Sequence, residues 1–221
     1  MSGFSTARQR MVDGQVRTND VTDRRILDAM LLLPRENFVP EEKRALAYLD
    51  LDLDVAPAGS VKRFLIKPML IAKMLQAAEI GDADHVLIVG CATGYAAAIA
   101  AKLSARVTAT ESDAAMVARG KEVLADLGLS NVTFKVAEAA AGDPDGAPYD
   151  VVILNGATEV IPETLYGQLK EGGRLVGVFG MSLPARAMIV TRSHGDFGNR
   201  ALFDAAAPVL PGLERRPAFV F

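Results

Sequence analysis

The pattern of apolar residues changes near Ile80. Before this point the spacing is helical, and Thr22 can cap a helix that Pro34 ends. A second helix is predicted to begin at Pro68, because proline is favoured in the first turn of a helix. Between them, residues 49–60 contain spaced aspartates, proline and glycine, which predict a loop or a short edge strand.

After Ile80, short apolar runs alternate with helical segments. The predicted strands are residues 86–89, 107–110, 132–136, 151–154 and 175–179. The predicted helices cover residues 96–103, 112–128 (with Ser112 as cap and Gly128 as stop) and 162–170, and the glycines at 172 and 173 are expected to turn the chain. Apolar strands that alternate with helices indicate a mostly parallel sheet covered on both faces. Residues 187–192 and 218–221 predict antiparallel strands at its edge.

Composition narrows the class of protein. Half of the 221 residues are hydrophobic and 23% are charged, which indicates a well-filled core rather than disorder. No apolar run approaches the roughly 20 residues that span a bilayer, so no membrane segment is expected. The net charge of −3 provides no global field for nucleic acid. The first residues lack the continuous apolar core of a signal peptide.

The chain has one cysteine, Cys91, and two histidines, His85 and His194. This set cannot form an internal disulfide or a cysteine-rich structural zinc site, so no metal site is predicted. Such a chain fits a reducing cytoplasm. We expect Cys91 to be a small packed residue rather than a nucleophile, and each histidine to be structural or exposed rather than catalytic.

The most informative segment follows the strand at 86–89 and reads Gly90-Cys91-Ala92-Thr93-Gly94-Tyr95. Gly90 and Gly94 allow a ligand and a helix N-terminus to approach the backbone closely, at the place where open α/β sheets bind ligands. The dinucleotide pattern G-x-G-x-x-G fails at Ala92 and Tyr95, and no P-loop pattern occurs. The spacing therefore suits a ligand without a pyrophosphate, such as S-adenosylmethionine.

Two acidic residues extend this interpretation. Glu111, at the tip of the next strand, can accept hydrogen bonds from ribose hydroxyls, and Glu138, after the third strand, can accept from an adenine amino group. Glycines after a strand can also simply make a turn, but two carboxylates at successive strand tips favour a nucleoside-type ligand. The predicted cofactor-binding residues are Gly90, Cys91, Thr93, Gly94, Glu111, Ser112, Glu138 and Asn155, with Asn155 in the floor under the reactive methyl group.

At this point the sequence resembles the protein-L-isoaspartate O-methyltransferases, which methylate the abnormal carboxylate of isoaspartyl residues. The segments that are similar to this family are Thr22-Asp23-Arg24-Arg25-Ile26-Leu27-Asp28-Ala29-Met30, Pro34-Arg35-Glu36-Asn37-Phe38-Val39-Pro40, the turn from Gly90 to Tyr95, Pro148-Tyr149-Asp150 and Gln168-Leu169-Lys170-Glu171-Gly172-Gly173-Arg174-Leu175. The first two are the more specific, since many methyltransferases share the last.

The chain also departs from the family's pattern. Where the family has Thr-Ile-Ser-Gln-Pro, with the serine at the methyl-acceptor site, this sequence has Phe64-Leu65-Ile66-Lys67-Pro68. Ile66 at the serine position has no side-chain group that hydrogen-bonds a carboxylate. The family's Gly-Asp-Gly is replaced by Ala137-Glu138-Ala139, its acidic residue in the first strand by Ile88, and the middle glycine of its turn by Ala92.

The resemblance implies a Rossmann-like class I methyltransferase fold. Residues 1–79 would form an N-terminal helical and acceptor-loop segment packed on an S-adenosylmethionine-binding α/β domain, residues 80–221, in one compact unit. It also implies transfer of a methyl group to a protein or peptide carboxylate, with Ile66 and Lys67 as acceptor-loop candidates. Such a reaction depends mainly on proximity and alignment, so no catalytic residue is assigned.

Several alternatives stay open at the level of sequence. Lys62, Arg63 and Lys67 either form a basic cluster that attracts an acidic acceptor or belong to a solvated loop. The enzyme could use a different acceptor, or the chain could be a non-catalytic cofactor-binding or interaction protein. A weak apolar stripe near the N-terminus, including Val12 and Val16, could pack on the body or on a second subunit, and the oligomeric state is undecided.

Overall fold

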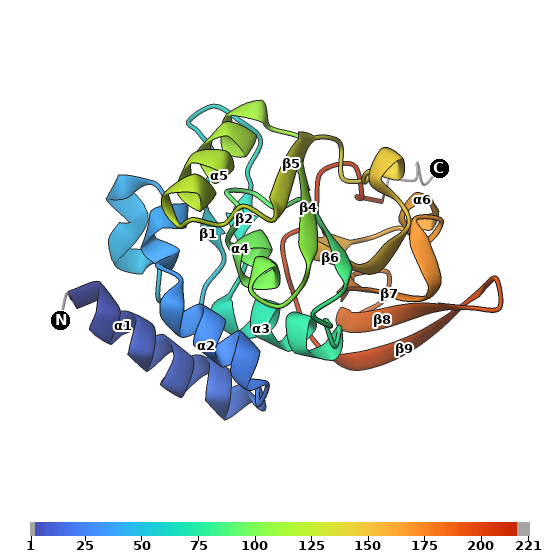
Figure 1. Ribbon diagram of the computed structural model, residues 1–221, viewed down its shortest axis with the longest axis horizontal. Coiled ribbons are helices and arrows are strands. Elements are labelled where there is room, and N and C mark those ends of the chain that lie inside the picture. Colours follow the sequence, from blue (N-terminus) through green and yellow to red (C-terminus); the bar gives the residue numbers. More distant parts are fainter. Residues whose placement is uncertain (1–2, 216–221) are drawn as a thin grey trace, which may run out of the picture.

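The computed structural model describes residues 3–215 (Figure 1). The N-terminal part is helical and irregular, and a small hairpin of β1 and β2 interrupts it. Its elements are α1 (Gly3–Met11), a π-turn (Val12–Val16), 3₁₀ turns (Arg17–Asn19, Arg35–Phe38 and Glu41–Leu46), α2 (Arg24–Leu32), β1 (Leu53–Asp54), β2 (Phe64–Leu65) and α3 (Pro68–Ala77). The predictions of a helix that Pro34 stops, a short edge strand within 49–60 and a helix from Pro68 are confirmed.

The remaining chain forms a seven-stranded sheet in the order β5-β4-β3-β6-β7-β8-β9. Strands β3 to β7 pair in parallel, and β8 and β9 add an antiparallel edge, which confirms the predicted architecture. The strands are β3 (His85–Val89), β4 (Arg106–Glu111), β5 (Val132–Val136), β6 (Tyr149–Thr158), β7 (Leu169–Phe179), β8 (Arg186–Ser193) and β9 (Asp196–Asp204). Helices α4 (Tyr95–Ala101) and α5 (Ala114–Asp126) connect the first three, a 3₁₀ turn (Pro144–Gly146) precedes β6, and α6 (Glu163–Tyr166) precedes β7.

Both predicted helix caps are displaced by one residue. Asp23, not Thr22, accepts the backbone N–H of Arg25 at 2.8 Å, and Asp113, not Ser112, caps α5. Each cap is an aspartate directly after a hydroxyl residue, and the carboxylate that immediately precedes the first helical turn takes the capping position. This displacement leaves Ser112 facing the tip of β4, where its hydroxyl lies 3.2 Å from a carboxylate oxygen of Glu111.

The predictions between residues 162 and 204 were partly wrong. The helix predicted for 162–170 is the single turn α6, and β7 already begins at Leu169. Gly172 and Gly173 lie inside β7, where a register shift relative to β6 accommodates them. Strand β9 was missed, because most of its side chains are exposed and lack an apolar stripe. The strand predicted for 218–221 lies outside the described residues.

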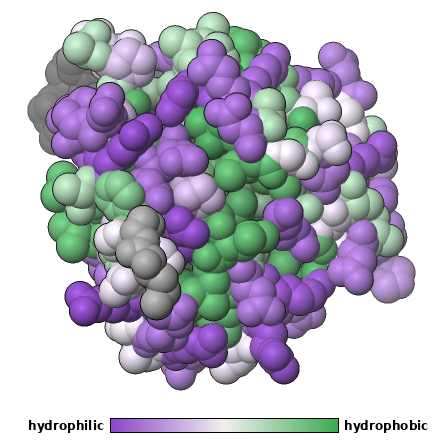
Figure 2. Space-filling view, turned by 60° about the vertical axis from the view of Figure 1, so that its left-hand side comes forward, coloured by the Kyte–Doolittle hydropathy of each residue, from purple (hydrophilic) through white to green (hydrophobic). Residues whose placement is uncertain are grey.

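One apolar core unites the N-terminal helices with the sheet. Val12 and Val16 are fully buried, and the Arg8 guanidinium donates to Tyr48 and Glu36, so the N-terminal stripe packs on the body. Figure 2 shows a mostly hydrophilic face crossed by an apolar band. Within residues 3–215, no helix has the length and apolarity needed to cross a membrane.

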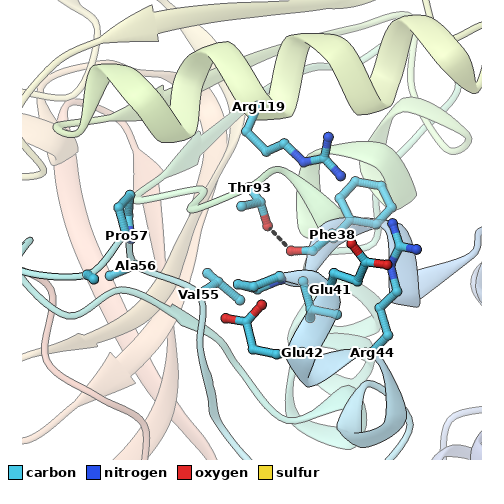
Figure 3. Close-up of a pocket in the computed structure, with 12 residues that line it drawn as sticks. Phe38, Glu41, Glu42, Arg44, Val55, Ala56, Pro57, Thr93 and Arg119 are labelled. Atoms are coloured by element: carbon cyan, nitrogen blue, oxygen red, sulfur yellow. Dashed lines mark hydrogen bonds between the residues drawn. The ribbon is translucent and has the colours of Figure 1, made fainter.

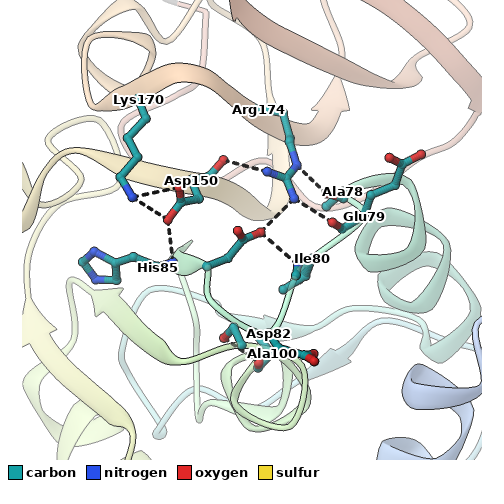
Figure 4. Close-up of polar contacts among 12 residues, drawn as sticks. Ala78, Glu79, Ile80, Asp82, His85, Ala100, Asp150, Lys170 and Arg174 are labelled. Carbon is teal, nitrogen blue, oxygen red and sulfur yellow. Dashed lines mark hydrogen bonds and ion pairs between the residues drawn. The ribbon is translucent and has the colours of Figure 1, made fainter.

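A polar network joins the amino ends of three neighbouring strands (Figure 4). The Asp150 carboxylate accepts the backbone N–H of His85 at 2.7 Å and an N–H of the Lys170 ammonium at 2.8 Å. Arg174 pairs with Asp84 at 2.8 Å and also donates to carbonyl groups just after α3. These contacts connect β3, β6 and β7 at the edge opposite the glycine turn.

Candidate functional site

The glycine turn lies at the carboxyl end of β3. Gly90 and Gly94 have φ angles of +67° and +95°, a region that glycine adopts without strain, and Ala92 between them has +50°. The chain proceeds from β3 outwards to β4 and β5 and then crosses to β6 on the other side of β3. The turn therefore occupies the switch point of the sheet, where ligands of open α/β folds bind.

Gly94 lies so close to Phe134 of β5 that no side chain fits at this position. A Cβ atom on Gly94 would lie 2.8 Å from Cζ of Phe134, and one on Gly120 of α5 would lie 2.7 Å from Cε1 of the same ring. The turn is also held from the N-terminal part, because the Thr93 hydroxyl donates to the Phe38 carbonyl at 2.5 Å (Figure 3). Both residues line a cavity of about 480 Å³, together with Arg119 and parts of the segments 39–44 and 55–58.

Glu111 lies where the sequence places it, at the tip of β4, but its carboxylate is fully buried and paired with Arg63. One oxygen is 2.9 Å from Arg63 Nε and the other 2.6 Å from Arg63 Nη2. The backbone N–H groups of Ala92 and Ser112 donate to it at 2.8 and 2.9 Å. The carboxylate predicted to receive ribose hydroxyls is thus bound by a cation from the β1–β2 hairpin.

Asn155 and Leu210 both lie close to Gly90. The Asn155 side-chain amide donates to the Gly90 carbonyl at 2.9 Å, which is consistent with its predicted place in the floor of the site. A Cβ atom on Gly90 would lie 2.5 Å from Cδ2 of Leu210 and 2.9 Å from Nη2 of Arg63. Leu210 is held there because its backbone N–H donates to the Ala157 carbonyl at 2.9 Å. No pattern in the sequence predicts this contact.

Ser112 and Glu138 lie in one cavity beside the Glu111 carboxylate. Both line a cavity of about 430 Å³, with Asp113, Arg63 and the loop residues 59–61. Glu138 is exposed, so its carboxylate is available at the position predicted for the adenine amino group. The roles assigned to these two residues stay predictions.

Arg35 holds the predicted acceptor loop in place, a role that its position in a segment similar to the family did not indicate. Arg35 is fully buried, donates to the carbonyls of Ile66 at 2.9 Å and Ala47 at 2.8 Å, and stacks 4.7 Å above the Tyr95 ring. Ile66 itself is buried, and its side chain belongs to the apolar core. Arg35 thereby joins the loop to the beginning of α4.

The predicted basic cluster of Lys62, Arg63 and Lys67 is wrong. Arg63 is buried against Glu111, whereas Lys67 lines a separate cavity with Lys73 and Phe203. Lys62 is exposed at the end of the hairpin loop. A run of basic residues in sequence therefore separates into three environments once the hairpin forms.

Cys91 is packed in the interior, His85 is buried and His194 is exposed, as the sequence indicated, whereas the absence of a catalytic role for them and the cofactor-binding role of Cys91 stay predictions. His85 is buried at the amino end of β3, where its ring contacts Thr108 at 3.1 Å, and His194 lies exposed in the β8–β9 turn. Cys91 is fully buried, and this burial raises the pKa of its thiol well above the usual value. Among the described residues, no group of histidine, cysteine and acidic side chains could hold a metal ion.

Cys91 is expected to resist thiol reagents in the folded protein, because the thiolate is the reactive form and burial disfavours it. Titration with Ellman's reagent at pH 8 should release no chromophore within minutes, and the full equivalent after unfolding in guanidinium. Rapid labelling of the folded protein would contradict the buried position.

The family model of protein-L-isoaspartate(D-aspartate) O-methyltransferase (PCMT) matches residues 6–198. The chain belongs to this family. Its S-adenosylmethionine-dependent methyltransferases include relatives from Koribacter versatilis, 37% identical over 204 residues (92% of this chain and 90% of the relative), and from an Anaeromyxobacter species, 40% identical over 171 residues (77% and 69%). Both relatives are named protein-L-isoaspartate O-methyltransferase, so the resemblance stated from the sequence is confirmed.

Solved structures of the same family share the fold of this chain. A protein-L-isoaspartate O-methyltransferase superposes with a TM-score of 0.81 at 25% identity and covers 94% of this chain and 67% of its own. A putative family member from Plasmodium falciparum, in complex with S-adenosyl-L-homocysteine, has a TM-score of 0.76 at 16% identity, which shows the shared fold. The chain thus has the predicted class I methyltransferase fold.

Proposed function

We propose that this PCMT-family chain transfers the methyl group of S-adenosylmethionine to a carboxylate of a protein or peptide, with the isoaspartyl side chain as the first candidate. The observation that supports this proposal is the family match over residues 6–198, which includes both the glycine turn and the acceptor loop. The single buried cysteine suits a reducing compartment, so we also propose a cytoplasmic location.

The residues at the carboxyl edge fit this cofactor in their chemistry. Ser112 and Glu138 offer a hydroxyl and a carboxylate in one cavity, and the backbone at Gly90 and Gly94 permits close approach. Glu111 is an acceptor of the kind that ribose hydroxyls require, on condition that Arg63 moves away from it. The bound cofactor supplies an electrophilic methyl group on a sulfonium centre.

The protein's own contribution to the reaction is alignment. An acceptor carboxylate with a pKa of about 4 is already ionised at pH 7, so no general base is needed. This agrees with the positions of His85 at the opposite end of β3 and of Cys91 in the interior. The Asn155 amide holds the Gly90 carbonyl, and Arg35 holds the Ile66 carbonyl, so the two sides of the reaction centre are fixed to the scaffold.

Ile66 supports a second candidate, a different carboxylate acceptor. Its side chain is 2% exposed and offers no hydrogen bond at the position where the family has serine. Replacement of serine by isoleucine removes a hydrogen bond to the acceptor. An acceptor with an apolar group beside its carboxylate would lose less binding energy by this replacement than an isoaspartyl peptide would.

The test measures transfer of a labelled methyl group to an isoaspartyl peptide, with the matched aspartyl peptide as control. We expect an ester on the isoaspartyl peptide alone, released as methanol in mild base. Label on the aspartyl peptide or on small organic acids instead would replace the first candidate by the second. If the cofactor binds but no acceptor is labelled, the proposed reaction is wrong.

A further inference from the structure

Arg63 occupies a place in the site for which its sequence position gives no reason. Arg63 is only 4% exposed. Its Nε and Nη2 atoms donate to the two oxygens of Glu111 at 2.9 and 2.6 Å. Paired, parallel hydrogen bonds between guanidinium and carboxylate are the strongest form of this contact. The hairpin thus places a cation directly on the acid at the tip of β4.

Arg63 and the neighbouring backbone N–H groups together fill all the hydrogen-bond acceptor positions of the Glu111 carboxylate. A carboxylate has about four lone-pair positions. The backbone N–H groups of Ala92 and Ser112 fill two of these positions at 2.8 and 2.9 Å, and Arg63 fills the other two at 2.6 and 2.9 Å. The Ser112 hydroxyl and the Asp113 N–H make only longer contacts, of 3.2 and 3.3 Å. Two further hydroxyl donors therefore cannot bind Glu111 while Arg63 remains there.

The Leu210 side chain fills the space beside Gly90. It approaches the face of Gly90 within the space that a single added methyl group would need, and Arg63 Nη2 reaches the same space. Asn155, which is predicted to lie under the reactive methyl group, donates to the carbonyl of the same glycine at 2.9 Å. The two side chains come from segments that are distant in sequence, and both converge on the glycine turn.

We propose that Arg63 and the cofactor's ribose hydroxyls compete for Glu111, so that the Arg63–Glu111 pair holds the enzyme in an autoinhibited, closed state. This inference rests on the proposed function, because it concerns the cofactor site of that reaction. Cofactor binding then requires the Arg63 side chain to leave, and the apparent affinity falls in proportion to the fraction of molecules that are open.

The structure provides a route for this movement. Arg63 lines the cavity of about 430 Å³ together with the exposed hairpin residues 59–61, so its side chain can leave Glu111 past these residues towards solvent. The backbone can stay in place, since the Arg63 carbonyl accepts the Val55 N–H at 2.8 Å at the base of the hairpin. The connecting residues 57–62 are all exposed, which favours local opening.

The first test is calorimetric titration of S-adenosylhomocysteine into the wild type, Arg63→Gln and the control Arg174→Gln. Arg174 also pairs with a carboxylate, Asp84, but at the opposite end of the sheet. We expect Arg63→Gln to lower the dissociation constant about tenfold or more, and Arg174→Gln to leave it unchanged. A dissociation constant for folded Arg63→Gln equal to or higher than that of the wild type overturns the proposal.

A second measurement uses the unaltered protein and avoids any folding defect of the variant. Phenylglyoxal modifies accessible arginines, and mass spectrometry of the peptide containing residue 63 reports how fast Arg63 reacts. Saturating S-adenosylhomocysteine should accelerate modification of Arg63 several-fold and leave Arg174 unaffected. Slower or unchanged modification would show that Arg63 stays in place when the cofactor binds.

These outcomes separate the two proposals. If the wild type binds S-adenosylhomocysteine and Arg63 neither moves nor opposes binding, the closed state is wrong and the proposed function stands. If neither the wild type nor Arg63→Gln binds it at millimolar concentration, both proposals fail.

Discussion

Replacing Glu111 with glutamine is expected to lower the free energy of unfolding by about 3–5 kcal/mol. The change leaves the buried Arg63 guanidinium without its anionic partner, and an uncompensated buried charge costs more than the lost attraction alone. Urea denaturation followed by circular dichroism measures this loss as a lower midpoint at an unchanged slope.

The double variant Arg63→Gln/Glu111→Gln provides the control, because it removes both charges. It should be more stable than Glu111→Gln alone. The single variant Arg63→Gln should also lose less, since Glu111 keeps the backbone donors of Ala92 and Ser112. Equal midpoints for the wild type and Glu111→Gln would show that the pair is solvated and that the buried geometry is wrong.

Replacing Gly94 with alanine should cost about 2–5 kcal/mol, the sum of left-handed strain and overpacking. The Cβ would meet the Phe134 ring at 2.8 Å, and this ring is already held between the turn and α5. Gly128 is the matched control: its φ of +66° is also positive, but a Cβ there meets nothing within 4 Å. We therefore expect Gly128→Ala to cost only the strain, about 1–2 kcal/mol.

The comparison of these two denaturation midpoints isolates the packing contribution of Phe134. A Gly94→Ala variant as stable as Gly128→Ala would mean that β5 yields at no cost. In that case the turn would not be seated on Phe134 as the structure places it.

The parallel part of the sheet could be predicted from sequence because burial on both faces leaves an unbroken apolar run, as in the fully buried β3. Strand β9 could not, because an exposed edge strand places no constraint on its side chains. The α6 region misled the prediction for another reason: Pro162 does precede a helix, but β7 pairing from Leu169 onwards overrides helical propensity after one turn.

In the site, the positions of Gly90, Glu111 and Glu138 followed from one rule, that residues after parallel strands meet at one edge. What fills the space between them did not follow. Arg63 next to Lys62 is typical of a solvated loop, and only the pairing of β1 with β2 directs it inwards. Leu210 reaches Gly90 through backbone hydrogen bonds to β6, for which a single sequence has no marker.

The network of Asp150, Lys170 and Arg174 comes from two of the segments by which this chain resembles its relatives. This network stabilises the sheet at the amino ends of the strands, whereas the proposed reaction takes place at their carboxyl ends. Substitutions in the predicted acceptor loop around Ile66 therefore leave this network intact. Two enzymes with this framework can share ancestry and cofactor yet differ in what they methylate, which makes the scaffold a suitable host for exchanged acceptor loops.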